Sequence, residues 1–339
     1  MSQTHPIILA IESSCDETSA AIIQRGKVLN NVIASQEVHH KHGGVVPELA
    51  SRAHQQNIYR VVNEAMDEAR IKNDELNAIA FTRGPGLMGS LLVGVSFAKG
   101  MALALNLPMI EVNHMEAHVL AHFIDEPRPE FPFLCLTVSG GHTQIVLVKS
   151  FLEMEVIGQT QDDAVGEAFD KAAKMMGLPY PGGPLIDKYA KLGNSNAYKF
   201  SQTSMPNLDF SFSGIKTQFL YFLRDKKKED ENFIDKNLND ICASLQKHLI
   251  GMLMQKLKLA SQQTGIKQIA IAGGVAANSG LRNTLNELAQ ELNWKVFIPE
   301  FQYCTDNAAM IAMAAHYKFL AGKFCAMDIA PIPNLSIGD

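Results

Sequence analysis

The chain of 339 residues lacks most features that mark secreted, membrane-spanning or disulfide-stabilised proteins. Its five cysteines, Cys15, Cys135, Cys242, Cys304 and Cys325, are odd in number, widely scattered and without a C-x-x-C pair, which disfavours disulfides, structural zinc and a redox couple. No 18 apolar residues follow one another without interruption, so we expect no membrane-spanning segment. No basic segment precedes the first apolar run, which indicates a cytoplasmic protein.

An excess of positive charge is also absent. The formal net charge is −5, so binding of nucleic acid through overall basicity is disfavoured and only a local basic patch could serve. Hydrophobic residues make up 47% and charged residues 19%, as in an ordinary globular protein with a sizeable core. The one dense charge run, Arg224 to Glu231, mixes both signs and predicts a solvated loop.

A strand-turn-strand pattern occurs twice. Ile8 to Ser14 begins the first copy and Phe133 to Ser139 the second, and helical segments and a further apolar strand follow each. The pattern predicts an α/β protein of two duplicated domains flanking a cleft, the alternative being two unrelated hairpins in one larger sheet. We expect a first domain over 1–130, a second with helical insertions over 131–305, a helix over about 306–325 that packs back on the first, and a tail over 326–339.

Three turns have the composition of phosphate-binding turns. Ser139 to Thr143 (SGGHT) and Ala272 to Arg282 (AGGVAANSGLR) are glycine-rich, and glycine lets backbone N–H groups approach phosphate closely. Glu12 to Thr18 (ESSCDET) carries carboxylates that would repel phosphate unless a cation lay between them. Simple chain reversal remains the alternative for each turn. Gly94 and Gly100, in a predicted helix, are expected to allow close packing.

Histidines recur at 114, 118 and 122 in NHMEAHVLAHF. Histidines four residues apart share a helical face and could bind one cation, but two ligands are too few to decide against an exposed polar helix. Glu116 stands in the third place, not directly after the first histidine, which disfavours a zinc protease of the H-E-x-x-H type. Further on, Thr305 as helix N-cap with Asp306 in the first turn is a sufficient structural explanation for both.

Nine stretches, in order, resemble the tRNA threonylcarbamoyladenosine transferase family (TsaD). They are IESSCDETS, VVPELASRAH, TRGPGLMGSLLVG, HMEAH, LTVSGGHTQ, GEAFDKAAKMMGLPYPGG, FSFSGIKT, AGGVAANSGLR and CTDNAAM. The resemblance covers most of the chain and implies an actin-like fold, the class of sugar kinases and chaperone ATPases.

The resemblance also implies a metal site and an adenylate site. The family's metal ligands fall on His114, His118 and Asp306, whereas His122 is left as a helix-surface residue. Imidazole and carboxylate suit both Fe²⁺ and Zn²⁺, and the expected ion is Fe²⁺. The family's adenylate-binding positions fall on Thr137, Val138, Ser139, Gly140, Gly141, Asp170, Gly183, Asp187 and Asn278.

The implied reaction moves a threonylcarbamoyl group from threonylcarbamoyl-AMP to the exocyclic amine of the adenosine just 3′ of the anticodon, in tRNAs reading codons that begin with A. The implied partners are an inactive paralogue, TsaB, and a P-loop ATPase, TsaE. No spacing identifies the base, and Glu12 is the candidate. Because the chain is acidic, either partners supply much of the tRNA contact or a local patch does. The candidate cations are Lys171, Lys174, Lys216 and Lys226 to Lys228.

Three other classes of protein compete with this interpretation. A kinase or chaperone-like ATPase of the same fold commonly has an aspartate in the second hairpin, where TVSGGHT has no acid. A metalloprotease is disfavoured by the position of Glu116. A non-catalytic scaffold would not need a complete metal set.

Overall fold

The computed structural model describes residues 5–34, 43–201 and 205–338, which form two compact units. Unit 1 comprises Met1–Pro129, Lys149–Glu155 and Pro299–Asp339, and unit 2 comprises Glu130–Val148 and Val156–Ile298. The segment Lys149–Glu155, expected in the second domain, belongs to unit 1. Its Phe151 ring stacks on Tyr317 at 3.5 Å between ring centroids, which explains the exchange.

Unit 1 is built on a six-stranded sheet in the order β3-β2-β1-β5-β6, with β4 paired to β2. The strands are β1 (Ile7–Glu12), β2 (Thr18–Gln24), β3 (Lys27–Val28), β4 (Val32–Ala34), β5 (Ala78–Gly84) and β6 (Met109–Asn113). The hairpin β1–β2 is antiparallel, whereas β1–β5 and β5–β6 are parallel. Parallel strands need crossover helices, so the sheet is covered on both faces.

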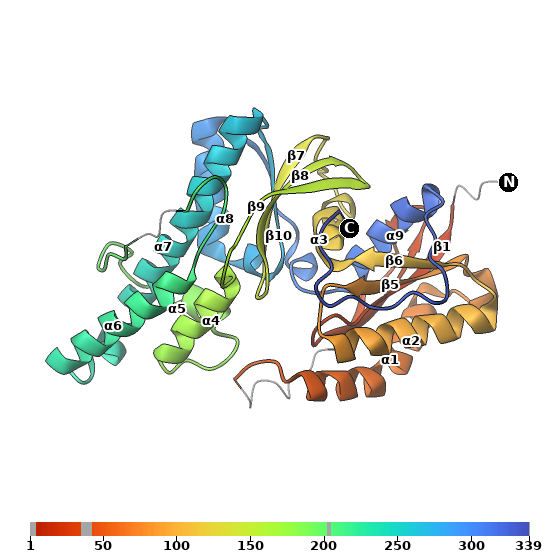
Figure 1. Ribbon diagram of the computed structural model, residues 1–339, viewed down its shortest axis with the longest axis horizontal. Coiled ribbons are helices and arrows are strands. Elements are labelled where there is room, and N and C mark those ends of the chain that lie inside the picture. The colour runs from red at the N-terminus through yellow and green to blue at the C-terminus, as the bar shows by residue number, and fades with distance from the viewer. Residues whose placement is uncertain (1–4, 35–42, 202–204, 339) are drawn as a thin grey trace. The chain divides into compact units, whose positions relative to one another are not determined.

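Helices α1 (Pro47–Ala69) and α2 (Met88–Leu105) cover one face of this sheet, and α9 (Ala308–Leu320) packs on β1 and β2 at the other (Figure 1). A short helix, α3 (His114–Leu120), follows β6 and contacts α9. Apolar side chains of β1 and β5, such as Ile11 and Phe81, meet Val61 of α1 and Val95 of α2 in the core. The hydrophobic run at Ile8 therefore becomes a central strand buried on both faces.

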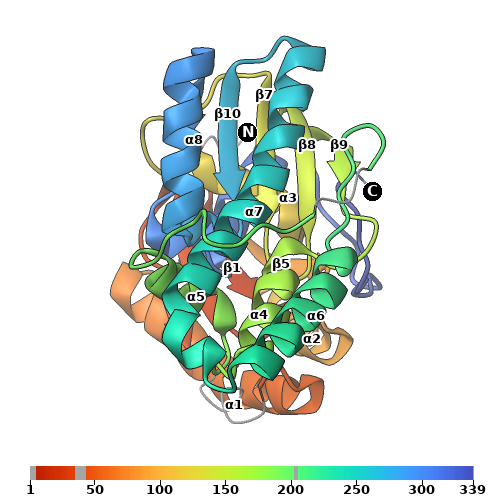
Figure 2. The ribbon, with the colours of Figure 1, turned by 90° about the vertical axis from the view of Figure 1, so that its left-hand side faces the viewer.

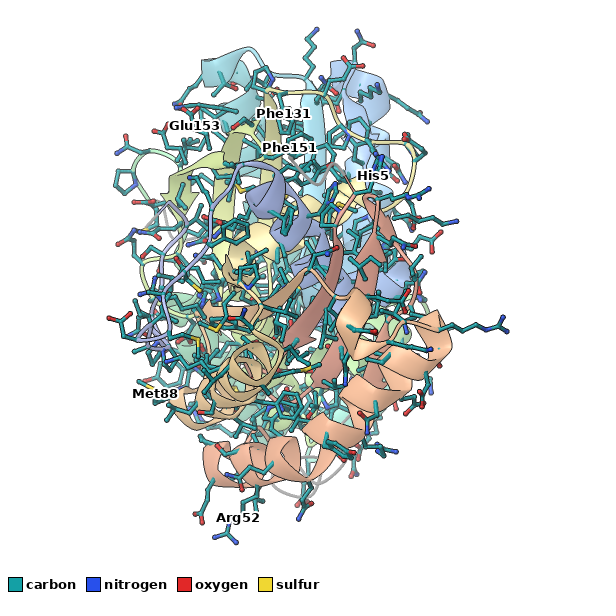
Figure 3. All side chains as sticks on the ribbon, turned by 90° about the vertical axis from the view of Figure 1, so that its right-hand side faces the viewer. His5, Arg52, Met88, Phe131, Phe151 and Glu153 are labelled. Atoms are coloured by element: carbon teal, nitrogen blue, oxygen red, sulfur yellow. The ribbon has the colours of Figure 1, made fainter. Side chains whose placement is uncertain are left out.

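Helix α2 is, within the described ranges, the one helix long and apolar enough to cross a membrane by length and composition. Its inward residues, including Leu91, Val95 and Ala98, are buried against β5 and α1. Gly94 lies where an added Cβ would meet Ser13 Oγ, so the expected close packing is confirmed there. At Gly100 nothing lies within 4 Å of an added Cβ, and the same expectation is wrong. Met88, at the start of α2, is 47% exposed (Figure 3).

Unit 2 repeats the strand pattern of unit 1 in a five-stranded sheet of order β11-β10-β7-β8-β9. The strands are β7 (Phe133–Val138), β8 (Thr143–Ser150), β9 (Glu153–Gln159), β10 (Gln268–Ala272) and β11 (Lys295–Phe297). As in unit 1, the first strand pairs antiparallel with the second and parallel with the strand that follows the helices. The predicted actin-like duplication is confirmed by this correspondence, which rules out two unrelated hairpins in one sheet.

The helices of unit 2 are α4 (Val165–Met175), α5 (Gly182–Ala190), α6 (Ser213–Glu229), α7 (Phe233–Thr264) and α8 (Ser279–Leu292). Helices α7 and α8 lie over one face of the sheet, while α4, α5 and α6 group beside them (Figure 2). The predicted solvated loop at Arg224 to Glu231 is wrong, because α6 continues to Glu229. Its buried residues Ile215, Phe219 and Leu223 recur at helical spacing and anchor the charged end.

The N-terminus of α6 is fastened by Asp162, which lies just before α4. One carboxylate oxygen accepts hydrogen bonds from the backbone N–H groups of Phe212 (2.8 Å) and Ser213 (3.2 Å). The other accepts from the hydroxyls of Ser211 and Ser213. Asp162 thus caps a helix that begins some 50 residues later, satisfying N–H groups that have no partner inside the helix.

Replacing Asp162 by alanine is expected to lower the free energy of unfolding by about 1–2 kcal/mol, because the helix start loses its acceptor. Chemical denaturation measures the change. The neighbouring Asp163→Ala is the control, since Asp163 makes a partly exposed ion pair with Lys171 at 2.7 Å and should cost less than about 1 kcal/mol. Equal losses in both variants would contradict the capping role.

Candidate functional site

Helix α3 places His114 and His118 one turn apart on the same face. Strand β6 runs directly into the helix, and Asn113 is the N-cap: its Oδ1 accepts from the N–H groups of Met115 (2.9 Å) and Glu116 (3.3 Å). The cap fixes the helix start at His114, so the next histidine on that face is His118. The two ring centroids lie 4.7 Å apart.

Residues near the C-terminus hold the start of α3 from outside. The Asn113 side-chain amide donates to the carbonyl of Ser336 at 2.7 Å, and the N–H of Gly338 donates to Glu116 Oε1 at 3.3 Å. Glu116 therefore receives a structural partner on the side away from the histidine pair. Residues 336–338 and the histidine helix are fastened to each other, although more than 200 positions separate them in the sequence.

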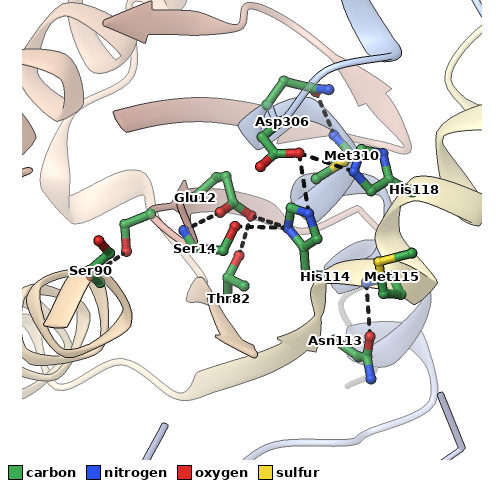
Figure 4. Close-up of polar contacts among 12 residues, drawn as sticks. Glu12, Ser14, Thr82, Ser90, Asn113, His114, Met115, His118, Asp306 and Met310 are labelled. Atoms are coloured by element: carbon green, nitrogen blue, oxygen red, sulfur yellow. Dashed lines mark hydrogen bonds and ion pairs between the residues drawn. The ribbon is translucent and has the colours of Figure 1, made fainter. Parts of the chain in front are cut away.

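Asp306 completes a group of three possible metal ligands. Helix α9 is capped by Asn307, whose Oδ1 accepts from Met310 N–H at 3.1 Å, so the expectation that Thr305 caps and Asp306 lies in the first turn is wrong. Asp306 lies just before the cap, and its Oδ1 is 3.1 Å from His118 Nε2 and 3.2 Å from His114 Nε2 (Figure 4). The candidate ligand atoms of the three residues all lie within 4.8 Å of one another.

Glu12, at the end of β1, supports His114 from the opposite side of the ring. Its buried carboxylate accepts from His114 Nδ1 at 3.0 Å and from the Thr82 hydroxyl, and its second oxygen accepts from the N–H of Ser14 (Figure 4). Because the Glu12 carboxylate holds the proton on Nδ1, Nε2 is the ring nitrogen that would lose its proton and bind a metal ion beside Asp306 Oδ1. This is the arrangement that orients a metal-binding histidine. The contacts of Glu12 favour this positioning role over the role of general base.

The two histidines differ in electrostatic environment. Burial alone would lower the pKa of His114, but the Asp306 and Glu12 carboxylates outweigh it and raise that pKa well above its ordinary value. Burial lowers the pKa of His118, which is therefore neutral at pH 7. For Asp306 and Glu12, His114 outweighs burial and lowers both pKa values. In the metal-free site, the positive charge of the His114 imidazolium lies between the Glu12 and Asp306 carboxylates. It offsets their negative charge, as a bound cation would.

These residues fit a divalent transition-metal ion. Two imidazole nitrogens and a carboxylate oxygen converge on one point, and a further carboxylate fixes the tautomer of one ring. Such a three-ligand set leaves coordination positions open for substrate oxygens. The two imidazole rings are not held equally. Glu12 holds His114 Nδ1, whereas His118 Nδ1 has no hydrogen-bond partner in the described part of the chain.

His122 does not join this group. It lies in a short 3₁₀ segment, Ala121–Phe123, after α3 has ended, so the helical spacing from His118 does not continue. The prediction that it is a helix-surface residue is wrong, because only 6% of it is exposed.

The β1–β2 turn contributes acidic groups beside the histidine pair. Burial, followed by Asp306 and Asp16, raises the pKa of Glu17 to about 9, so Glu17 is protonated at pH 7 when no cation is bound. The expectation that the carboxylates of this turn would repel phosphate unless a cation lay between them stays a prediction.

Sequence reasoning missed His54, which holds the same turn. It is fully buried on α1, with Nδ1 2.8 Å from the Thr18 hydroxyl and Nε2 3.0 Å from the carbonyl of Cys15. A polar residue on the inward face of an otherwise apolar helix stripe was the available signal.

The glycine turn after β7 lies in unit 2. The N–H of Ser139 donates to the carbonyl of His142, and the N–H of His142 donates to Ser139 Oγ, so the turn is closed on itself. At Gly140 and Gly141 an added Cβ would meet nothing within 4 Å, which leaves their backbone approachable. Thr137 and Val138, by contrast, are buried in the strand.

The remaining predicted adenylate positions lie on helices of unit 2: Asp170 is inside α4, Gly183 and Asp187 are in α5, and Asn278 is the N-cap of α8. Asp170 Oδ1 accepts from the N–H groups of Gly182 (2.8 Å) and Gly183 (3.2 Å). Asp187 Oδ1 accepts from the Ser279 hydroxyl at 2.7 Å, and Asn278 caps α8 through Leu281 N–H at 2.9 Å. Asp170 Oδ2 stays outside these bonds and can accept from a hydroxyl, whereas Asp187 Oδ2 lies 3.3 Å from Lys191 Nζ, an ion pair beside which a hydroxyl would have to bind.

Replacing Asn113 by alanine is expected to weaken metal retention about tenfold and to lower the free energy of unfolding by about 1–2 kcal/mol. The variant loses both the cap of α3 and the bond to Ser336. Competition with a chelator measures the metal affinity. Asn113→Asp keeps the capping oxygen but not the amide donor, and an intermediate affinity is expected. Unchanged affinity in Asn113→Ala would contradict the positioning of α3 by its cap.

Comparison with known proteins gives consistent matches. The family model described as TsaD, tRNA N6-adenosine threonylcarbamoyltransferase, matches residues 27–313. A curated protein of that name from Cytophaga hutchinsonii is 61% identical over 98% of this chain and 96% of its own length. One from Porphyromonas gingivalis is 59% identical over 98% of both chains.

Among solved structures, HypF of T. kodakarensis superposes with a TM-score of 0.65 at 13% identity, over 95% of this chain and 49% of that one. At this identity the likeness concerns the fold alone, and it agrees with the actin-like class.

Proposed function

The chain belongs to the tRNA N6-adenosine threonylcarbamoyltransferase family, acyltransferases that modify tRNA, and we propose that its donor is threonylcarbamoyl-AMP and that a bound metal ion orients it. The observation that carries this proposal is the convergence of His114 Nε2, His118 Nε2 and Asp306 Oδ1 at one buried point. Because the chain belongs to this family, we prefer this function to the kinase, protease and scaffold alternatives.

In the proposed reaction the N6 amine of adenosine attacks the carbonyl carbon of the threonylcarbamoyl group. A C–N bond forms, the bond from that carbon to the phosphate oxygen breaks, AMP leaves, and the proton lost by the amine passes to solvent. The amine is a weak nucleophile because its lone pair is delocalised into the ring. A divalent cation, when bound, polarises the donor carbonyl and offsets developing negative charge.

The protein residues serve to hold and orient. His114, His118 and Asp306 would hold the cation, and Glu12 keeps the His114 proton on Nδ1 so that Nε2 faces it. We assign the adenylate part of the donor to the turn Ser139 to Gly141, whose open glycine amides suit phosphate. Asp170 and Asp187 would accept bonds from ribose hydroxyls.

The choice of metal and the protein partners belong to the same proposal. We propose Fe²⁺ in preference to Zn²⁺, although both accept two imidazoles and a carboxylate. A paralogue of the TsaB type and a P-loop ATPase of the TsaE type are the expected partners in a cytoplasmic assembly. Mass-spectrometric metal analysis of protein purified without chelators tests the ion.

Metal affinity is expected to rise with pH, by about tenfold per pH unit below the raised pKa of His114. His114 must lose its proton before Nε2 can bind metal, whereas His118 is already neutral, so binding releases one proton. Competition titrations between about pH 6 and pH 8 measure this slope. In Glu12→Gln, the pH range over which metal affinity rises should shift to lower pH, because a carboxylate that raises the His114 pKa is lost. An affinity independent of pH would count against His114 as a ligand.

The deciding experiment reconstitutes transfer from threonylcarbamoyl-AMP to an unmodified tRNA, with partners present and with this protein added or omitted. Modified adenosine should form only when the protein is present and metal-loaded. Equal modification without it, or phosphorylation of a small acceptor in place of tRNA, would contradict the proposal.

A further inference from the structure

We propose that the outward face of α6 is a tRNA-binding surface; the inference rests on tRNA being the substrate. The face, called the α6 face below, consists of Lys216, Thr217, Leu220, Tyr221, Arg224, Lys227 and Lys228. All seven residues are exposed. Exposure here is a consequence of spacing, because steps of three and four positions from Lys216 through Leu220 and Arg224 to Lys227 trace one side of a helix.

The opposite side of α6 is buried. Ile215, Phe219 and Leu223 pack inward, where α6 contacts α4 and α7. The four bonds to Asp162 fix the first turn in addition. The α6 face is therefore a preorganised surface on a firmly held helix, which lowers the entropy lost on binding.

The centre of the face carries two adjacent exposed apolar residues. Leu220 is 48% and Tyr221 50% exposed, and the Arg224 guanidinium lies 4.6 Å from the centroid of the Tyr221 ring. An aromatic ring with an arginine plane beside it is the combination on which unpaired nucleobases stack.

The charges on α6 are sorted by side. Asp225 lies on a flank and pairs with Lys228 at 2.8 Å and with Arg224 at 3.3 Å, and Glu229 pairs with Lys226 at 2.8 Å. Lys216 and Lys227 make no ion pair with any acidic residue of the described ranges. They stand 11 positions apart, roughly 16 Å along the helix, a span that can reach several phosphates.

The separation of cations from acids on α6 explains how a chain with net negative charge could bind tRNA, which is a polyanion. With a formal net charge of −5, RNA contact requires cations concentrated in one place. The α6 face concentrates four: Lys216 and Lys227 make no ion pair within the described ranges, whereas Arg224 and Lys228 share Asp225 at its edge. An RNA substrate would use both the cations and the Tyr221–Arg224 pair, so we assign the face to RNA, and loss of a protein partner is a separate outcome of the test.

The test compares two triple charge reversals in the full-length protein by titrating unmodified tRNA at several salt concentrations. The first is Lys216→Glu, Arg224→Glu and Lys227→Glu. The second, a matched control, is Lys27→Glu, Lys267→Glu and Lys323→Glu, three exposed cations outside α6. Both change the net charge equally, from −5 to −11, so a difference between them reports location.

The α6 reversal is expected to weaken tRNA binding at least about tenfold at low salt and to reduce the salt dependence of log K by about 2. The control should change affinity less than about threefold. Tyr221→Ala should weaken binding about fivefold or more without altering the salt slope, and Tyr221→Phe should restore it. Thermal unfolding of each variant checks that the fold is kept.

Equal effects of the two reversals would overturn the proposal, as would unchanged tRNA binding with lost association to a partner protein, which would make the face a protein interface. Wild-type transfer, measured in parallel with partners present, tests the proposed function separately. If the wild-type protein modifies tRNA and the α6 reversal does so with an unchanged KM for tRNA, the proposal for the α6 face is wrong. The proposed function is then still supported.

Discussion

Replacing His118 by alanine is expected to abolish metal retention and threonylcarbamoyl transfer together. The loss leaves two protein ligands, and Asp306 Oδ1 loses its 3.1 Å partner. Since a bound cation contributes several kcal/mol of charge stabilisation, transfer should fall on the order of 10²–10³-fold. Metal content by mass spectrometry and modified adenosine per tRNA are measured on the same preparation.

The matched control is His122→Ala, a second buried histidine of the same segment that does not approach Asp306. It should retain metal and most of the transfer activity. If both variants lost metal equally, damage to the fold would explain the result. Full wild-type activity after exhaustive chelation would eliminate the metal role altogether.

Replacing Glu12 by glutamine is expected to reduce metal affinity about 10–100-fold, because the amide cannot hold the Nδ1 proton of His114 as a carboxylate does. Alanine at this position should also cost about 3–5 kcal/mol of unfolding free energy in the metal-free protein, since it leaves a buried imidazolium with one partner fewer and the Thr82 hydroxyl without its acceptor. Chelator competition and chemical denaturation measure the two effects.

This experiment also separates the two possible roles of Glu12. If Glu12 is the general base, Glu12→Gln should abolish transfer and leave metal affinity unchanged. If Glu12 positions His114, the same variant should lower metal affinity. Thr82→Val provides the control, because it removes a bond to Glu12 while leaving the carboxylate in place. Its effect on metal affinity should be much smaller.

Much of the fold followed from local patterns. The apolar runs at Ile8 and Phe133 predict two equivalent hairpins, and the further apolar strands expected after them are β5 and β10. Such segments are predictable because a strand in the middle of a sheet is buried on both faces, and a short continuous run of apolar residues indicates that burial. The duplicated order of pairing in the two sheets then follows from parallel crossovers.

The errors arose where a distant part of the chain decides a local structure. Local spacing predicts Asp306 as a helix-start carboxylate, but Asn307 takes the cap and Asp306 reaches the histidines, as the family resemblance implies. The charged end of α6 was interpreted as loop, yet it is helical because Ile215, Phe219 and Leu223 are buried against other helices. His122 was assigned to the surface because the helix was extended past its end at Leu120.

The sequence by itself determined the α/β class, the duplication, the family resemblance and the pairing of His114 with His118, since each depends on short-range spacing. Only the tertiary structure decided how these residues are used. It brings Asp306 to the two Nε2 atoms, places Glu12 on the far side of His114, and fastens α3 to residues 336–338. These contacts join positions about 100 to 220 apart, where the outcome depends on strand order and packing, and no local pattern encodes that geometry.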